Sequence, residues 1–246
     1  MKTIIIDPGH GGNDSGAVAY DLQEKDLTLK ISKLIKVYLE NTYENVGVFL
    51  TRDSDKFIEL IQRSSFANAK NADVFLSIHI NAGFGTGYES FVYESPSPGS
   101  KQFQSYLHDE MKSILDEFKL VDRGQKRADY SVLRNTNNPA VLSEILFIDN
   151  LVNAERLKND QFILSVAHAH AKAIGKFLGL ELKAMENYSP SNKDMLNASI
   201  SVLKRLEDKD NGISSMHREK LLEGNLSVSD AIAILYVALY RQLLDK

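Results

Sequence analysis

The stretch TIIIDPGHGG, residues 3–12, decides the fold because it leads a short buried strand directly into a histidine surrounded by glycines. Its first four residues are all β-branched, which favours a strand, and the proline and glycines that follow end that strand. Ligands of open α/β sheets usually bind at the carboxyl ends of the strands. We therefore expect His10 to lie at the edge of a site. A glycine-rich anion loop is the alternative, but the spacing matches neither a dinucleotide fingerprint nor a P-loop.

The composition limits the classes of protein that fit. The chain has 246 residues, of which 43% are hydrophobic and 25% charged, and this suits a globular protein with one large domain or one large and one small. A net charge of -4 argues against a nucleic-acid partner. Because cysteine is absent, a metal would have to bind histidine and carboxylate. No apolar stretch reaches the roughly 20 residues that span a bilayer.

Short apolar runs alternate with longer amphipathic segments, as is typical of an α/β domain. The sequence predicts a single mixed, mostly parallel twisted sheet of about six strands, flanked by helices. The expected strands are residues 3–6, 46–50, 74–80, 88–93, 131–133 and 140–147. The expected helices are residues 24–42, 57–70, 100–118 and 154–178.

The composition changes near residue 182, where this domain is expected to end. The stretch ENYSPSNKD, residues 186–194, is typical of a linker. We therefore predict a domain over residues 1–182, a linker over 183–193 and a small all-helical C-terminal module over 194–246. The apolar run AIAILYVALY in this module favours burial in an interface, either with the large domain or in a homo-oligomer formed through the C-terminal helices.

A second histidine lies in VFLSIHINA, residues 74–82. Alternation along a strand places His79 and Asn81 on one face, near the carboxyl end. A core histidine satisfied by hydrogen bonds is the usual alternative. Two histidines at two strand ends of one sheet favour a metal site instead.

A hydrolytic zinc site needs three protein ligands and one open position, and two histidines with one glutamate form a standard set. Glu24 stands at the start of the first predicted helix, one loop after His10. The alternative is a capping box, in which the Glu24 carboxylate accepts a hydrogen bond from the amide of Asp21. The spacing alone favours the cap.

A further carboxylate, Glu144, lies inside PAVLSEILFIDN, residues 139–150. Apolar neighbours on both sides predict a central strand, where a buried carboxylate is costly unless it is paired or used. Burial would raise the pKa of Glu144 toward neutrality, which suits a proton carrier. The alternative is a salt bridge to a buried arginine such as Arg63 or Arg134.

Several motifs occur together in a recognisable order and approximate spacing. They are IDPGHGGNDSGA, EKDLTL, LTRDSD, SIHINA and YSVLRNTNNPAVLSEILFIDN. Over about residues 1–180 the chain resembles the zinc-dependent N-acetylmuramoyl-L-alanine amidases, the family often called Amidase 3. This resemblance implies a zinc hydrolase that cleaves the amide bond between N-acetylmuramic acid and the first L-alanine of peptidoglycan.

The resemblance also implies a role for each matching residue. His10, Glu24 and His79 match the zinc ligands of the family, so that Glu24 is a ligand and not a cap. Glu144 matches the catalytic glutamate, and Asn81 matches an asparagine beside the metal with an expected role in substrate binding. The departures are Ile80, where the family commonly has alanine, and Ser143, where it usually has a hydrophobic residue.

A chain of this kind resembles a phage endolysin or a bacterial autolysin, with peptidoglycan as its partner. The N-terminal residues show no secretory signal pattern, so we expect cytoplasmic synthesis without a signal peptide and action on the cell wall after release. The C-terminal module would target the wall or form oligomers. Two alternatives stay open: a peptidoglycan-binding module without catalysis, and a zinc peptidase that cuts within the stem peptide.

Overall fold

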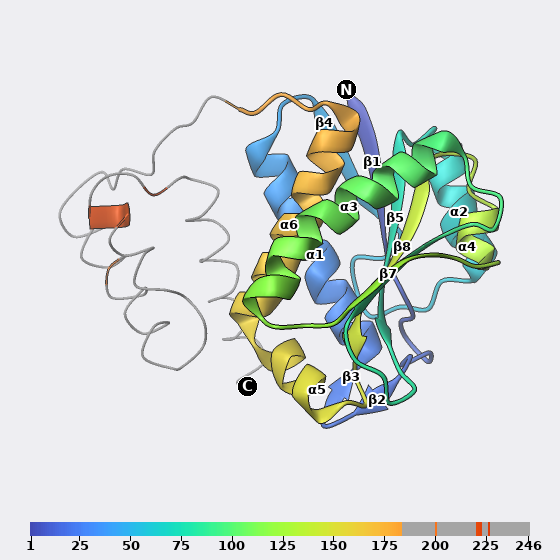
Figure 1. The fold of residues 1–246 in the computed structure, drawn as a ribbon. Helices are drawn as coiled ribbons and strands as arrows, with labels where there is room; N and C mark the ends of the chain where they lie inside the picture. The colour runs from blue at the N-terminus through green and yellow to red at the C-terminus, as the bar shows by residue number, and fades with distance from the viewer. Residues whose placement is uncertain (184–199, 201–219, 223–225, 227–246) are drawn as a thin grey trace.

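The computed structural model describes residues 1–183, 200, 220–222 and 226. The predicted linker, apart from its first residue, and most of the predicted C-terminal module lie outside the described residues. Residues 1–183 form one large sheet with helices on both faces, as Figure 1 shows. This architecture confirms the predicted fold class.

The sheet has six strands in the order β4-β1-β5-β8-β6-β7. All neighbouring strands are parallel except β6 and β8, which are antiparallel, so the sheet is mixed and mostly parallel. A separate small hairpin joins β2 to β3. The strands are β1 (Lys2–Pro8), β2 (Val18–Ala19), β3 (Leu22–Gln23), β4 (Val46–Leu50), β5 (Val74–Asn81), β6 (Tyr88–Val92), β7 (Asp122–Arg127) and β8 (Ala140–Phe147).

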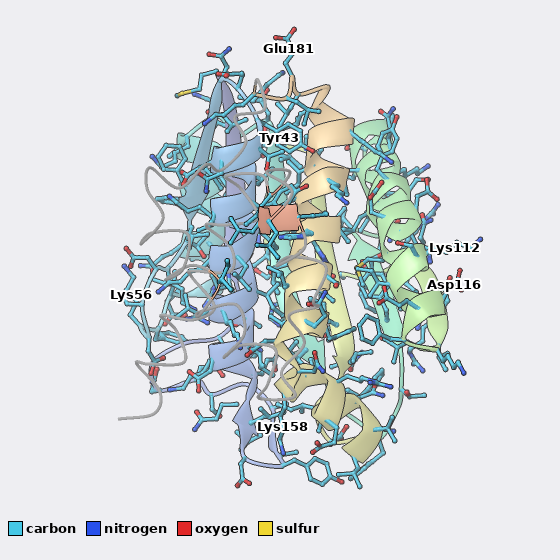
Figure 2. All side chains as sticks on the ribbon, turned by 90° about the vertical axis from the view of Figure 1, so that its left-hand side faces the viewer. Tyr43, Lys56, Lys112, Asp116, Lys158 and Glu181 are labelled. Carbon is cyan, nitrogen blue, oxygen red and sulfur yellow. The ribbon has the colours of Figure 1, made fainter. Side chains whose placement is uncertain are left out.

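Two layers of helices cover the sheet. One layer contains α1, α3 and α6, which lie side by side in Figure 2, and the opposite face is covered by α2 and α4. Tyr43, labelled in Figure 2 between the upper ends of α1 and α6, packs so closely on Gly175 that a Cβ there would lie 2.4 Å from the ring. The helices are α1 (Glu24–Thr42), α2 (Leu60–Ala69), α3 (Pro98–Glu117), α4 (Ser131–Arg134), α5 (Leu151–Lys158) and α6 (Asp160–Leu178).

The central strands β1, β5 and β8 are buried on both faces, which explains their mostly apolar sequences. Ile4 and Ile6 of β1 point into the core beneath α1 and α6, whereas Ile5 points into the smaller core on the α2 side. Because β1, β5 and β8 are parallel neighbours, their carboxyl ends meet at one edge of the sheet. Residues that follow these strands are therefore brought together.

Two predicted elements were wrong. The predicted strand at residues 131–133 is the short helix α4, and the sixth strand is β7, an edge strand whose residues are polar and largely exposed. The predicted helix at residues 154–178 is two helices, α5 and α6. They separate at Asn159, whose side chain accepts a hydrogen bond from the amide of Phe162 and so caps α6.

A buried polar pair links β8 to α6. His170 is fully buried, and its Nδ1 lies 2.7 Å from the carbonyl oxygen of Val166 while its Nε2 lies 2.8 Å from the hydroxyl of Ser143. Both contacts are satisfied by a neutral ring, in which Nδ1 donates to the carbonyl and Nε2 accepts from the hydroxyl. Burial lowers the pKa of His170 to about 4, against the raising effect of the Val166 carbonyl. The pair explains why a polar residue stands at position 143.

Acid is expected to destabilise the fold through His170. The unfolded state takes up this proton near the ordinary histidine pKa of about 6.5, whereas the folded state resists it until about pH 4. Stability from this group is therefore complete above pH 6.5 and falls as the pH drops toward 4, by about 2 to 3 kcal/mol near pH 4.5. Urea unfolding of the parent chain and His170→Gln at pH 7 and 4.5 measures this loss. An equal pH dependence in both proteins would contradict the assignment.

Candidate metal centre

The loop that carries His10 is held from beneath by two arginines. Arg63 donates to the carbonyl oxygens of Pro8 and His10 at 2.6 and 2.8 Å. Arg52 donates to the carbonyl oxygens of Pro8 and Gly9 at 3.0 and 2.8 Å. His10 itself has a left-handed backbone with φ of 61°, a conformation that costs energy unless its surroundings fix it. These buried hydrogen bonds hold the loop in that conformation.

The charge of Arg63 is balanced by Asp7, the buried carboxylate of β1. Asp7 accepts hydrogen bonds from Arg63 at 2.8 Å, from the Thr51 hydroxyl at 2.6 Å and from the Ser77 hydroxyl at 2.8 Å. A buried ion pair of this kind is tolerated because its remaining polar atoms are satisfied. Three strands, β1, β5 and the end of β4, are thereby tied together under the site.

His10, Glu24 and His79 meet above this network. They offer donor atoms that lie within 4.8 Å of one another, so the group could hold a metal ion. One oxygen of Glu24, Oε1, lies 3.1 Å from Nε2 of His10 and 3.0 Å from Nδ1 of His79. The three residues come from the loop after β1, the first turn of α1 and the end of β5. They converge because those elements end at the same edge of the sheet.

The surroundings of Glu24 exclude the capping box. The N-cap of α1 is Gln23, without a side-chain capping bond, and the Glu24 carboxylate accepts from the amides of Ala17 and Ile80 at 3.0 and 2.9 Å. Burial raises the pKa of this carboxyl, but its contacts with His10 and His79 outweigh burial and lower the pKa below its usual range. Glu24 is therefore an ionised carboxylate aimed at two imidazoles.

A second carboxylate orients His10. Nδ1 of His10 lies 2.9 Å from both oxygens of Asp14, which leaves Nε2 directed at Glu24. In metal sites, a carboxylate that binds the second ring nitrogen of a ligand histidine fixes the orientation of the ring. Sequence reasoning missed Asp14, although its place four residues after His10 in the same loop is a usable signal.

Two glycines leave room for the side chains of the site. A Cβ on Gly9 would lie 2.4 Å from the His79 ring, and a Cβ on Gly16 would lie 2.6 Å from the Glu24 carboxylate.

The donor set fits a divalent transition metal. Two imidazole nitrogens and one carboxylate oxygen are the ligands of a His/His/Glu zinc site, in which the fourth position is open to water or substrate. Burial lowers the pKa values of His10 and His79, but the carboxylates beside them outweigh burial and raise both values above the usual one. An arrangement in which Glu24 attracts two imidazoles this strongly is also the one that attracts a cation.

Glu144 lies beside this group. It is the register partner of His79 across the parallel strands β5 and β8. Its Oε2 is buried and forms no hydrogen bond within the described part of the chain. Burial, aided by the negative charges of Glu24 and Glu89, raises the pKa of Glu144 to about 7, against the lowering effect of His79.

The arginines suggested as partners of Glu144 bind elsewhere. Arg63 pairs with Asp7, and Arg134 pairs with Asp129 at the surface. The salt-bridge alternative is therefore wrong for both of them. An unpartnered buried carboxylate next to a metal-binding group has the properties of a proton carrier.

Asn81 points toward a carboxylate that sequence reasoning missed. Its Nδ2 donates to Oε1 of Glu89 at 2.6 Å, and its Oδ1 accepts from the amide of Ala82 at 2.8 Å. A role of Asn81 in substrate binding stays a prediction. Glu89 had the same signal as Glu144, since it is a lone charge in the buried strand YESFV.

The other described histidines lie outside the metal-binding group. His168 and His170 lie on α6, and His108 binds the Asp122 carboxylate at 2.9 Å; His217 lies outside the described residues. Within the part of the chain that the structure describes, His10, Glu24 and His79 form the one cluster with metal-ligand geometry. No helix among the same residues has the length and apolar character needed to cross a membrane.

The chain is similar in sequence to known proteins. The family model described as N-acetylmuramoyl-L-alanine amidase matches residues 4–176. The endolysin of Bacillus phage SPP1 is 50% identical over 186 residues, which cover 74% of this chain and 68% of that protein. The N-acetylmuramoyl-L-alanine amidase CwlM of Bacillus licheniformis is 44% identical over 188 residues, which cover 76% of this chain and 73% of that protein.

A solved structure agrees with the fold. The catalytic domain of CwlV, an N-acetylmuramoyl-L-alanine amidase from Bacillus (Paenibacillus) polymyxa, superimposes with a TM-score of 0.69 at 33% identity, covering 74% of this chain and all of that domain. The chain belongs to the N-acetylmuramoyl-L-alanine amidase family.

Proposed function

We propose that this chain is a zinc-dependent amidase of the bacterial cell wall. It hydrolyses the amide bond between the lactyl group of N-acetylmuramic acid and the first L-alanine of the peptidoglycan stem. The observation that supports this most strongly is the convergence of His10, Glu24 and His79 beside the unpartnered carboxylate of Glu144. Family membership supplies the class of substrate.

His10, Glu24 and His79 would hold the zinc ion. When bound, zinc polarises the scissile carbonyl and lowers the pKa of a water molecule from 15.7 to about 7. Asp14 keeps the His10 ring turned toward this position, and the arginines beneath the loop keep its backbone fixed. The chain thus presents its ligands in place, without a rearrangement of the loop.

Glu144 moves the proton. Its carboxylate takes a proton from the attacking water and donates it to the nitrogen of L-alanine, so that the leaving group departs as a neutral amine. A carboxyl group whose pKa lies near neutrality can both accept and donate this proton at physiological pH. Glu24 cannot take this role, because its neighbours keep it ionised.

The names of related proteins suggest where this chain acts. One of them is named an endolysin and another a sporulation-specific amidase, so we propose that this chain also acts on peptidoglycan in the bacterial wall. We further propose residues 1–182 as the catalytic domain and residues 194–246 as a module for wall targeting or self-association. The family match ends at residue 176, in keeping with this division.

Mass spectrometry of digested muropeptides tests the proposed bond. We expect intact stem peptides that begin with L-alanine, together with glycan strands that have lost their peptides. Shortened stems would identify a peptidase instead, and walls left unchanged would identify a binding module. The same digestion with the metal removed serves as the control, since it should release no peptide.

A further inference from the structure

A small charged cluster on β6 and β7 carries one more positive than negative charge. Glu89 is only 4% exposed, and its Oε2 accepts from Nε of Arg123 at 2.7 Å. The same oxygen also accepts from Nζ of Lys126. These two cations outweigh burial and lower the pKa of Glu89, so this carboxylate is ionised. One carboxylate with two cations leaves a net charge of about +1.

The cluster adjoins the candidate metal centre. Glu89 is the direct register partner of Glu144 across the antiparallel strands β6 and β8, so the two carboxylates lie on the same face of the sheet. The other oxygen of Glu89 accepts from Asn81, two residues after His79. The positive charge of the cluster is therefore placed beside the group proposed to carry the proton.

Arg123 is held in place but has unused hydrogen-bond donors. Its guanidinium lies 4.8 Å above the ring of Phe147, and its Nε is bound to Glu89. Among the described residues, Nη1 and Nη2 of Arg123 have no hydrogen-bond partner, and the side chain is 34% exposed. A fixed guanidinium with a free outer edge matches the geometry of a carboxylate, to which it can donate two parallel hydrogen bonds.

Lys126 is less suited than Arg123 to bind a carboxylate of a ligand. Its single ammonium group binds Glu89 and lies 5.9 Å from the centre of the Phe91 ring. An ammonium is a point charge without the paired donors of a guanidinium. Lys126 therefore neutralises Glu89, and the charge of Arg123 is left for a ligand.

We propose that Arg123 determines substrate specificity by binding the α-carboxylate of the D-glutamate residue that follows L-alanine in the stem peptide. This inference rests on the proposed function. The stem is anionic at the free α-carboxylate of this residue. Arg123 supplies a fixed positive charge close to Glu144, where the peptide on the leaving side of the scissile bond must lie.

Two soluble substrates that differ at one group test this proposal. Both are disaccharide tripeptides, one with the free α-carboxyl of D-glutamate and one with that group converted to its amide. The parent enzyme is expected to cleave the free acid faster. Arg123→Gln should lower kcat/KM for the free acid by about tenfold or more, mainly through KM, and change that for the amide by less than about twofold. Arg123→Lys should lie between the two, because it keeps the charge and loses the paired donors.

Arg127→Gln is the matched control. Arg127 lies on the same strand but pairs in register with Val92, whose side chain enters the core on the α3 side, so it faces away from Lys126 and the cluster. The Arg127→Gln substitution should leave the rates on the free acid and on the amide unchanged. Thermal unfolding checks that the control and both Arg123 variants are folded at the temperature of the assay.

Three results would each contradict a different part of the proposal. An equal loss on both substrates in Arg123→Gln would mean that Arg123 only supports the structure. No loss on either would mean that it does not contact the substrate. If the parent enzyme releases no peptide from either substrate or from intact walls, the proposed function itself is wrong.

Discussion

Glu144→Gln is expected to lower the rate of wall lysis by at least about a hundredfold while zinc stays bound. Glutamine keeps the shape of the side chain but can neither accept the proton of water nor donate it to the departing nitrogen. The three ligand residues are untouched, since no hydrogen bond joins Glu144 to them. Turbidity loss of purified walls measures the rate, and elemental analysis of the dialysed protein measures the zinc.

The stability of this variant distinguishes a catalytic from a structural role. A buried carboxylate without a partner costs folding energy, so its neutral isostere should be at least as stable as the parent. Glu155→Gln, a substitution on the exposed surface of α5, is the control and should change neither rate nor stability. Near-full activity in Glu144→Gln would overturn the assignment. Loss of zinc from it would show that Glu144 supports the ligands instead of carrying the proton.

The candidate site was largely predictable because its residues break the local pattern. His79 and Glu144 are polar residues within strands that are mostly apolar, and His10 follows the first strand in a glycine-rich loop. Parallel strands bring such positions to one edge. Glu24 was different: its spacing favoured a cap, and the resemblance to a known family was needed to prefer a ligand.

The surroundings of the site could not be predicted in the same way. Arg123 stands in the polar run DRGQKR, where a strand buried on neither face shows no apolar alternation. It lies near Glu144 because it binds Glu89, which pairs in register with Glu144 across β6 and β8. Ser143 stands where the family usually has a hydrophobic residue. Its hydroxyl binds His170, which lies on α6, and this contact explains the polar residue. Contacts between distant segments leave no signal in a single sequence.

Removal of the metal is expected to abolish wall lysis, and added zinc to restore it. The ligands are the only groups placed to bind the ion within the described part of the chain, and without it the attacking water keeps a pKa near 15.7. The apo protein should stay folded. Asp7, Arg52 and Arg63 hold the His10 loop through contacts that do not involve a metal, and Glu24 still binds both imidazoles. Lysis assays and circular dichroism before and after chelation measure the two effects.

Single substitutions test which residues bind the zinc ion. His79→Ala should lose both zinc and activity, because a two-ligand site binds zinc far more weakly than a three-ligand site. His108→Ala is the matched control, since it removes an imidazole that binds Asp122 on the α3 side and should keep zinc and full activity. Zinc retained at one ion per chain in His79→Ala would contradict the ligand set. Lysis that persists in the chelated parent would contradict metal-dependent hydrolysis altogether, and Glu144 would then have to activate water unaided.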